Sequence, residues 1–280
     1  MLFSQVLTCC GGNKGSEGNK EIIPPPTPNN YKYEKNFSSI RYLTYNSFYC
    51  KSNTQTHAFS KENTQAFAKV IKSLDADFVA IQELDSGTTE RSNRYLLKQI
   101  NEATGKNYQM IFAHAADYSN GAIGCGLLIS PKYSILHSQT IALPGDEKRM
   151  LIIAELKDFV IMSTHLDLNA SARKLSAKLI VEAAKKYSKP ILLAGDLNDS
   201  PAWSSDNSCF PILSQNFSIY SATESNLSSN IDYVLLWNAN NTKLKKIGSN
   251  IVKQLNIDDN IEDLTTVSDH YPVYVDFSIQ

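Results

Sequence analysis

Clusters of polar residues recur in this chain at the ends of short apolar runs. Five of these ends carry acids, amides or imidazoles: Thr44-Tyr45-Asn46, Ile81-Gln82-Glu83, Thr164-His165-Leu166-Asp167, Gly195-Asp196-Leu197-Asn198 and Ser268-Asp269-His270. A sixth cluster, Asn230-Ile231-Asp232-Tyr233, places an acid just before an apolar run. Strand ends on a rigid scaffold can hold side chains precisely. Carboxylates and amides with two imidazoles are typical of a site in which a hard cation handles phosphate, since a zinc site uses more cysteine and histidine.

The spacing within two of these clusters predicts how their side chains point. Asp196 and Asn198 are two residues apart and share a face if the strand continues, whereas the adjacent Asp269 and His270 diverge in an extended segment. Each cluster taken singly also has an ordinary structural interpretation. Asp-x-Asn after an apolar run favours a turn, and Glu83 or His165 alone would be a solvated carboxylate or a structural histidine.

The elements that must position these residues are mostly strands. Apolar spacing predicts helices from Lys61 to Leu74, from Arg94 to Thr104 and from Ala170 to Tyr187. Strands are predicted at residues 40–45, 78–81, 108–113, 122–130, 151–156, 159–163, 191–194, 233–237, 245–252 and 273–277. Many strands with few long helices indicate mixed or antiparallel α+β layering, and no repeat or linker divides residues 36–280, which we interpret as one domain.

The ordered set of motifs Tyr-Asn, Gln-Glu, Thr-His-Leu-Asp, Gly-Asp-Leu-Asn-Asp, Ile-Asp-Tyr and Ser-Asp-His-Tyr-Pro resembles the endonuclease/exonuclease/phosphatase superfamily. That superfamily includes pancreatic deoxyribonuclease, abasic-site endonucleases, neutral sphingomyelinases and inositol polyphosphate phosphatases. The resemblance runs from about Ile40 to Phe277. It implies an α+β (α/β) four-layer sandwich, in which two packed mixed, mainly antiparallel β-sheets are flanked by helices and the site lies at one end.

The resemblance also implies a role for each matched residue. Glu83 corresponds to the principal Mg²⁺ ligand, with Asn46 and Asp269 close to the same ion, and Mn²⁺ is the alternative metal. The remaining matches concern the phosphate and the proton transfers. Asp196 and Asn198 position the attacking water or the leaving group, and His165 contacts the phosphate or donates a proton. His270 is supported by Asp232, and we hypothesise that this pair is the general base, although the family also offers Asp196 for that role.

Arginine is scarce in this chain, with five residues in all, and Arg149 is our first choice for a contact to substrate phosphate. A solvated charge at a strand end is the alternative interpretation of Arg149. The chain departs from many relatives by carrying Asn230, and not a basic residue, before Ile-Asp-Tyr. The departure leaves the catalytic motifs intact, but it weakens any transfer of substrate identity from one branch of the family.

The composition limits the partners. A net charge of −1 argues against coating of nucleic acid or anionic membrane by bulk electrostatics. We therefore predict a Mg²⁺-dependent phosphoric-ester hydrolase, foremost a phosphodiesterase, acting on nucleic acid, a phospholipid or a sugar or inositol phosphate. A non-catalytic binding domain on the same fold is the rival hypothesis. A monomer without an obligate protein partner is expected.

Residues 1–35 have a different character. Leu2 to Gly12 resembles the apolar end of a bacterial secretion signal running into a lipobox-like Leu-Thr-Cys-Cys, and a Gly-, Asn- and Pro-rich tether follows. This resemblance predicts lipidation at Cys10, with Cys9 as second choice, and an extracytoplasmic, membrane-anchored protein. No basic segment precedes the apolar run, so an ordinary frayed N-terminus is the alternative.

Overall fold

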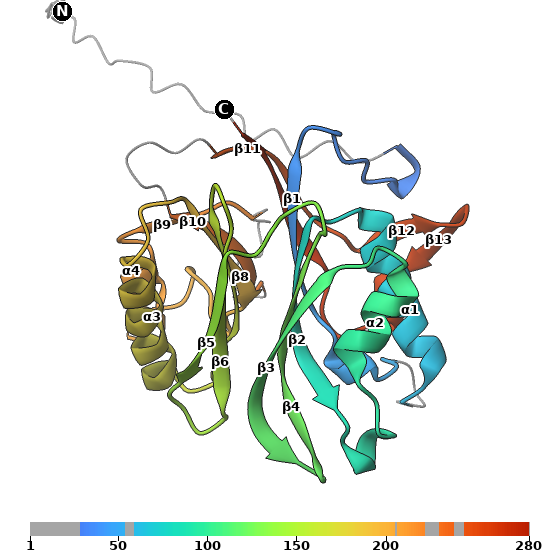
Figure 1. Cartoon of the computed structure of the whole chain (residues 1–280), viewed down its shortest axis with the longest axis horizontal. Helices are drawn as coiled ribbons and strands as arrows, with labels where there is room; N and C mark the ends of the chain where they lie inside the picture. The colour runs from blue at the N-terminus through green and yellow to red at the C-terminus, as the bar shows by residue number, and fades with distance from the viewer. Residues whose placement is uncertain (1–28, 54–58, 205, 222–229, 238–243, 280) are drawn as a thin grey trace, which may run out of the picture.

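The computed structural model describes residues 29–53, 59–204, 206–221, 230–237 and 244–279. Two six-stranded sheets face each other, α1 and α2 cover the outer side of one, and α3 and α4 cover the outer side of the other (Figure 1). The predicted four-layer sandwich of mixed, mainly antiparallel sheets is therefore confirmed. The predicted N-terminal signal, tether and lipidated cysteine lie outside the described residues.

The first sheet is built around a parallel pair of strands with antiparallel neighbours. Its order is β11 (Leu244–Ile251), β14 (Val273–Ile279), β1 (Ile40–Asn46), β2 (Phe78–Ser86), β4 (Gly121–Ile129) and β3 (Gln109–Tyr118). α1 (Lys61–Leu74) connects the parallel strands β1 and β2, and α2 (Leu96–Thr104) packs beside it. The connection brings the carboxyl ends of β1 and β2 to the same edge of the sheet.

The second sheet repeats this plan. Its order is β5 (His137–Leu143), β6 (Arg149–Glu155), β7 (Val160–His165), β8 (Ile191–Asp196), β10 (Asp232–Trp237) and β9 (Phe217–Ile219). β7 and β8 are its parallel pair, and α3 (Ala170–Ala184) connects them. α4 (Phe210–Leu213) lies against α3, and a small hairpin of β12 (Gln254–Ile257) and β13 (Asn260–Asp263) lies beside α1.

Alternation along the strands divides the core into three layers. In β1, Leu43 and Tyr45 face α1 and α2, whereas Ile40 and Tyr42 face the second sheet. The middle layer joins Phe78 and Ala80 to apolar residues of β6, β7, β8 and β10, and a third layer lies under α3 and α4. Strands buried on both faces explain the continuous apolar runs of the sequence.

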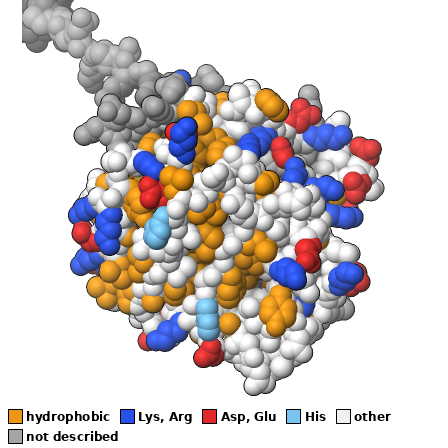
Figure 2. Space-filling view, viewed as in Figure 1, with side chains coloured by type: hydrophobic (Ala, Val, Ile, Leu, Met, Phe, Trp, Pro, Cys, Tyr) orange, Lys and Arg blue, Asp and Glu red, His pale blue; other side chains and the backbone are white. Residues whose placement is uncertain are grey.

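The predicted helix over 61–74 has the observed bounds, and the other two helices are slightly shorter than predicted. The predictions missed β5, β9, α4 and the β12–β13 hairpin. Four short 3-10 turns complete the described elements: η1 (Asn29–Tyr31), η2 (Phe48–Cys50), η3 (Thr89–Arg91) and η5 (Leu264–Thr266). On the face seen in Figure 2, acidic and basic side chains are interspersed around a broad apolar area, in line with the nearly neutral sequence. Among the described residues, no helix is long and apolar enough to cross a membrane.

Candidate active site

Asn46 and Glu83 come from the parallel pair of the first sheet. β2 does not end at Glu83 as the sequence indicated, but continues to Ser86 through a bulge between Ile81 and Leu84. Glu83 lies in this bulge with a φ of 55°, a conformation that a residue with a side chain rarely adopts. Ser47 stabilises the bulge because its hydroxyl donates to the Glu83 carbonyl over 2.7 Å. The bulge thereby lets a side chain in mid-strand reach the site.

The Asn46 amide connects the two sheets. Its Nδ2 donates to Glu83 Oε1 and to Asp196 Oδ2, at 3.1 Å in each case, while its Oδ1 accepts from the Phe48 backbone N–H at 3.0 Å. Ser268 further fixes this strand end by donating to the Asn46 carbonyl at 2.7 Å. In this arrangement the amide N–H₂ group, and not the carbonyl oxygen, faces the carboxylates.

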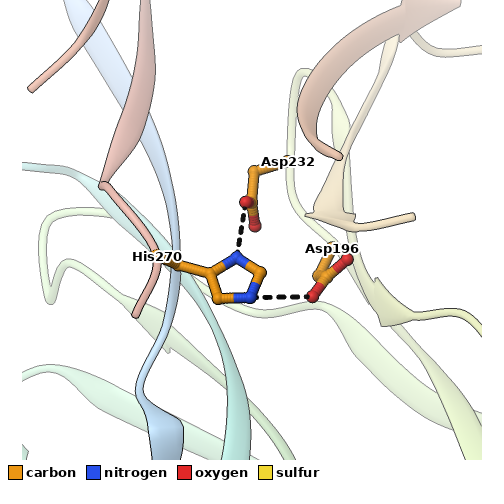
Figure 3. Close-up of side chains that lie close together, drawn as sticks. All are labelled: Asp196, Asp232 and His270. Atoms are coloured by element: carbon orange, nitrogen blue, oxygen red, sulfur yellow. Dashed lines mark hydrogen bonds and ion pairs between the residues drawn. The ribbon is translucent and has the colours of Figure 1, made fainter. Parts of the chain in front are cut away.

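His270 lies between two aspartates of the second sheet (Figure 3). Its Nδ1 is 2.7 Å from Asp232 Oδ2, a short hydrogen bond, and its Nε2 is 3.7 Å from Asp196 Oδ2. The second distance is too long for a hydrogen bond. Asp232 is the first residue of β10 and is paired in register with Asp196, the last residue of β8, so the sheet itself sets the two carboxylates side by side.

His165 and Asn198 also lie next to Asp196. His165 Nε2 is 3.5 Å from Asp196 Oδ2 and 3.1 Å from Asn198 Nδ2, and its Nδ1 faces Arg149 at 2.9 Å. The strand does not continue through Asn198, because β8 ends at Asp196 and Asn198 has a φ of 47°. The Asn198 backbone N–H instead donates to Asp196 Oδ1, which forms the turn that Asp-x-Asn favours.

Burial and charge set the ionisation of the site. Burial, together with the charge of Asp269, raises the pKa of Glu83, and burial beside Asp232 raises the pKa of Asp196. Burial opposes protonation of His270, but Asp232, Asp196 and Asp269 outweigh it and raise the pKa of His270 to about 10. Burial, followed by the charges of Arg149 and His270, holds the pKa of His165 well below its usual value. His165 is therefore a neutral imidazole at neutral pH.

The donor atoms at this site fit a hard divalent cation. Glu83 and the exposed Asp269 repel each other and offer only oxygen, which Mg²⁺ prefers, and the exposure of Asp269 leaves room for water ligands. The buried Oδ1 of Asp232 has no hydrogen-bond partner among the described residues. Asp196, Asp232 and His270 form a second group with ligand atoms within 4.8 Å of one another. Because Asp232 already hydrogen-bonds His270, the oxygen-only pair is the simpler place for the cation.

A small pocket opens beside these residues. Its polar lining comes from Tyr49, Glu83, Lys148, Arg149 and His165, and its apolar lining comes from β3, β4 and Met150. Sequence reasoning gave no role to Tyr49, Lys148 or Asp167. Asp167 accepts from the Glu147 backbone N–H at 2.8 Å and so holds the turn that leads into Arg149. Its place in the Thr-His-Leu-Asp motif was the available signal.

The structure thus gathers the predicted site residues that it describes, from both sheets, at one end of the sandwich. Asn46, Asp196, Asp232 and His270 form one connected cluster with Glu83, and His165 joins Asn198 and Arg149 to it. Their individual roles stay predictions.

Comparison with known proteins decides the family. The model of the Endonuclease/Exonuclease/phosphatase family matches residues 43–270. The chain belongs to this family. It is accordingly a hydrolase of phosphoric esters, as the sequence predicted. A comparison with curated protein sequences finds no match.

Solved structures show that the fold is shared at low sequence identity. An endonuclease/exonuclease/phosphatase from Bacteroides vulgatus has a TM-score of 0.66 and 17% identity, covering 86% of this chain and 99% of its own. The mannosyl-6-phosphatase of Bacteroides thetaiotaomicron VPI-5482 has a TM-score of 0.65 and 16% identity, covering 86% and 100%. D. rerio TDP2 complexed with single-strand DNA product has a TM-score of 0.62 and 14% identity, covering 86% and 99%. These similarities establish the fold and leave the substrate open.

Proposed function

We propose that this protein is a Mg²⁺-dependent phosphodiesterase in which water attacks the phosphorus in line with the leaving group. The observation that carries the proposal is the Asp232–His270 hydrogen bond of 2.7 Å, which leaves the other imidazole nitrogen facing the cluster of Asp196 and Glu83. An imidazole oriented by a buried carboxylate is suited to moving a proton near neutral pH.

Each side chain of the site has its own role in this reaction. His270 Nδ1–H donates to Asp232, which fixes the tautomer and leaves Nε2 as the atom that exchanges a proton with water. A divalent cation held by Glu83 and Asp269 would neutralise the phosphate oxygens and offset the acids that raise the pKa of His270. The neutral His165 lies between Arg149 at Nδ1 and Asn198 and Asp196 at Nε2, which would place its ring beside the phosphate.

The substrate we propose is a phosphodiester that is bound by a few side chains close to the scissile phosphate. Lys148 and Arg149 line a small pocket beside the site, and contacts to a few phosphates suffice for turnover without a basic stripe. Among the structural neighbours, one is named a sugar phosphatase and another is bound to DNA. A panel of substrates must therefore separate a nucleic acid from a phospholipid and from a sugar or inositol phosphate.

The test is hydrolysis of bis(p-nitrophenyl) phosphate, plasmid DNA, RNA, sphingomyelin and inositol phosphates, each with Mg²⁺, with Mn²⁺ and with chelator. We expect chelator-sensitive hydrolysis of at least one diester, and its loss in His270→Gln. Glu182→Gln, on the exposed side of α3, is the matched control and should keep full activity. Turnover of monoesters alone would contradict the assignment as a diesterase.

For the N-terminal segment we propose lipidation at Cys10 and an extracytoplasmic location, on the strength of the lipobox-like Leu-Thr-Cys-Cys. Expression in a bacterium with a labelled fatty acid tests this proposal. Label should enter the wild-type protein and disappear in Cys10→Ser but persist in Cys9→Ser. An unlabelled wild-type protein would contradict it.

A further inference from the structure

The pocket beside the catalytic cluster has a cationic side that the hydrolytic chemistry does not use. Lys148 and Arg149 line this pocket together with Glu83 and His165, which mark where the reacting phosphate would lie. Arg149 contacts His165 directly, with its guanidinium NH1 2.9 Å from Nδ1. A group bound to the outer side of Arg149 would therefore be a close neighbour of the scissile phosphate.

The guanidinium of Arg149 does not use all of its hydrogen-bond donors. NH1 is engaged by His165, NH2 is paired with the carboxylate of Glu147, and Nε is buried with no hydrogen-bond partner among the described residues. The Glu147 side chain is half exposed, at 50%, whereas that of Arg149 is 14% exposed. An exposed ion pair of this kind contributes little and breaks readily. Glu147 thus occupies, loosely, a position that suits an anion from the substrate.

The walls of the pocket are held rigidly. The backbone of residues 48–50 has positive φ throughout, and Arg94 stabilises it by donating to the carbonyls of Tyr49 at 2.6 Å and Cys50 at 3.4 Å. Arg91 stacks on the Tyr49 ring at 3.8 Å and pairs with the buried Asp85 at 3.2 Å. On the facing side, Asp167 anchors the turn before Arg149. Such support is typical of a preorganised binding surface.

We propose that Lys148 and Arg149 form a subsite for a second anionic group of the substrate, a phosphate one step along from the scissile phosphate, and that this group displaces Glu147 from Arg149. The inference rests on the proposed function and narrows its substrate class to esters with two neighbouring phosphates. Arg recognises phosphate with paired N–H groups, and releasing Glu147 frees NH2 for this contact.

The experiment compares a nucleoside 5′-(p-nitrophenyl phosphate) with the same compound carrying a 3′-phosphate. Its readout is the ratio of kcat/KM with the 3′-phosphate to kcat/KM without it, so that a general effect of Arg149 on His165 cancels. We expect a ratio above one in the wild type and, in Glu147→Gln, an increase of roughly 2- to 5-fold, the size of an exposed ion pair. Arg149→Gln should lower it by about tenfold, the size of a charged hydrogen bond. Lys148→Gln should lower it less, and Glu182→Gln should leave it unchanged.

A second readout needs no turnover. The rise in melting temperature caused by the nucleoside 3′,5′-bisphosphate is compared with that caused by the 5′-monophosphate in each folded variant. We expect a larger rise with the bisphosphate in the wild type, a still larger one in Glu147→Gln and no difference in Arg149→Gln. Equal responses to the two ligands in the wild type would overturn the subsite. Absence of hydrolysis of both esters, with the bisphosphate still favoured, would overturn the catalytic proposal and support the subsite.

Discussion

The two ends of the central strands β1 and β2 both bury charge, but they balance it differently. At the starting end, Arg41 is fully buried and its Nε and NH2 donate to Asp276 at 2.7 and 2.8 Å, while its NH1 donates to the carbonyls of Tyr33 and Leu74. Asp77 accepts from the Arg41 backbone N–H at 2.9 Å and pairs with Lys35 and Lys132. Each buried acid at this end therefore has a basic partner.

At the far end, where the candidate active site lies, the acids outnumber the bases. Glu83, Asp196, Asp232 and Asp269 come together with His270, and the nearby guanidinium of Arg149 contacts His165 and Glu147. At one end of the two strands the buried charges are neutralised, which stabilises the fold. At the other, acidic end, the carboxylates repel one another. Repulsion of this kind is typical of functional sites, and a divalent cation held by Glu83 and Asp269 would offset it.

The largest effect is expected at the acidic end. His270→Gln keeps the size and polarity of the side chain but cannot exchange a proton, so kcat should fall by about 10²- to 10⁴-fold. Steady-state hydrolysis of bis(p-nitrophenyl) phosphate measures it, with the melting temperature as a check on folding. A rate within a few-fold of the wild type would exclude His270 as the base and favour Asp196.

A substitution at the neutralised end should instead change the stability of the fold. Arg41→Met leaves the Asp276 carboxylate and the carbonyls of Tyr33 and Leu74 without their buried partner and should lower the free energy of unfolding by roughly 3–5 kcal/mol. Urea denaturation measures this loss, and kcat per folded molecule should stay unchanged. Lys98→Met, which breaks an exposed pair with Glu102, is the control and should cost no more than about 0.5 kcal/mol. Equal losses in the two variants would contradict the structural role of Arg41.

Removing a carboxylate from the acidic end should raise the free energy of unfolding. Glu83→Gln relieves repulsion with Asp269 and removes a charge whose burial is unfavourable, so the metal-free protein should gain about 0.5–2 kcal/mol of stability while activity is lost. Thermal unfolding in chelator tests this, with Glu102→Gln as the exposed control. A destabilised Glu83→Gln protein would show that the acids of the site are already balanced.

The smallest expected effect is on the pH dependence of stability, which should have opposite signs at the two ends. Glu83 keeps its proton to a higher pH when folded than its usual 4.5, so unfolding releases a proton in that window and the metal-free stability falls as pH rises through it. At the neutralised end, burial raises the pKa of Asp75, but the charges of Lys106, Lys35 and Lys132 outweigh burial and lower it. The contribution of the Asp75 carboxylate to the stability of the fold is therefore lost as pH falls below about 3.8. Urea denaturation at several pH values should give a shallower slope just above pH 4.5 in Glu83→Gln. An unchanged slope would mean that Glu83 does not titrate there.

The sequence predicts much of this fold because local signals agree with it. The helix from Lys61 to Leu74 has its apolar face, and Ser60 caps it by accepting from the Asn63 N–H at 3.2 Å. The missed strands lack such signals. β5 is a half-exposed edge strand, and the β12–β13 hairpin turns through Asp258 and Asp259 with φ of 52° and 64°, where Asn-Gly is the recognisable pair.

The site was predicted as a set of residues but not as a geometry. Family motifs identified Glu83, whereas its left-handed backbone arises from a β2 strand that continues to pair with β4 beyond it. The contact of Arg149 with His165, and of Asn46 with both Glu83 and Asp196, depends on how the two sheets pack. No spacing rule within one strand contains that information.

The most direct test of the acidic end as a cation-dependent hydrolytic site is a Mg²⁺ titration of chelator-treated protein, followed through hydrolysis of bis(p-nitrophenyl) phosphate. We expect a rate near zero without metal that rises and saturates with Mg²⁺ in the wild type, and a much weaker response in Glu83→Gln. Hydrolysis that is independent of added metal, or no hydrolysis at any Mg²⁺ or Mn²⁺ concentration, would contradict it.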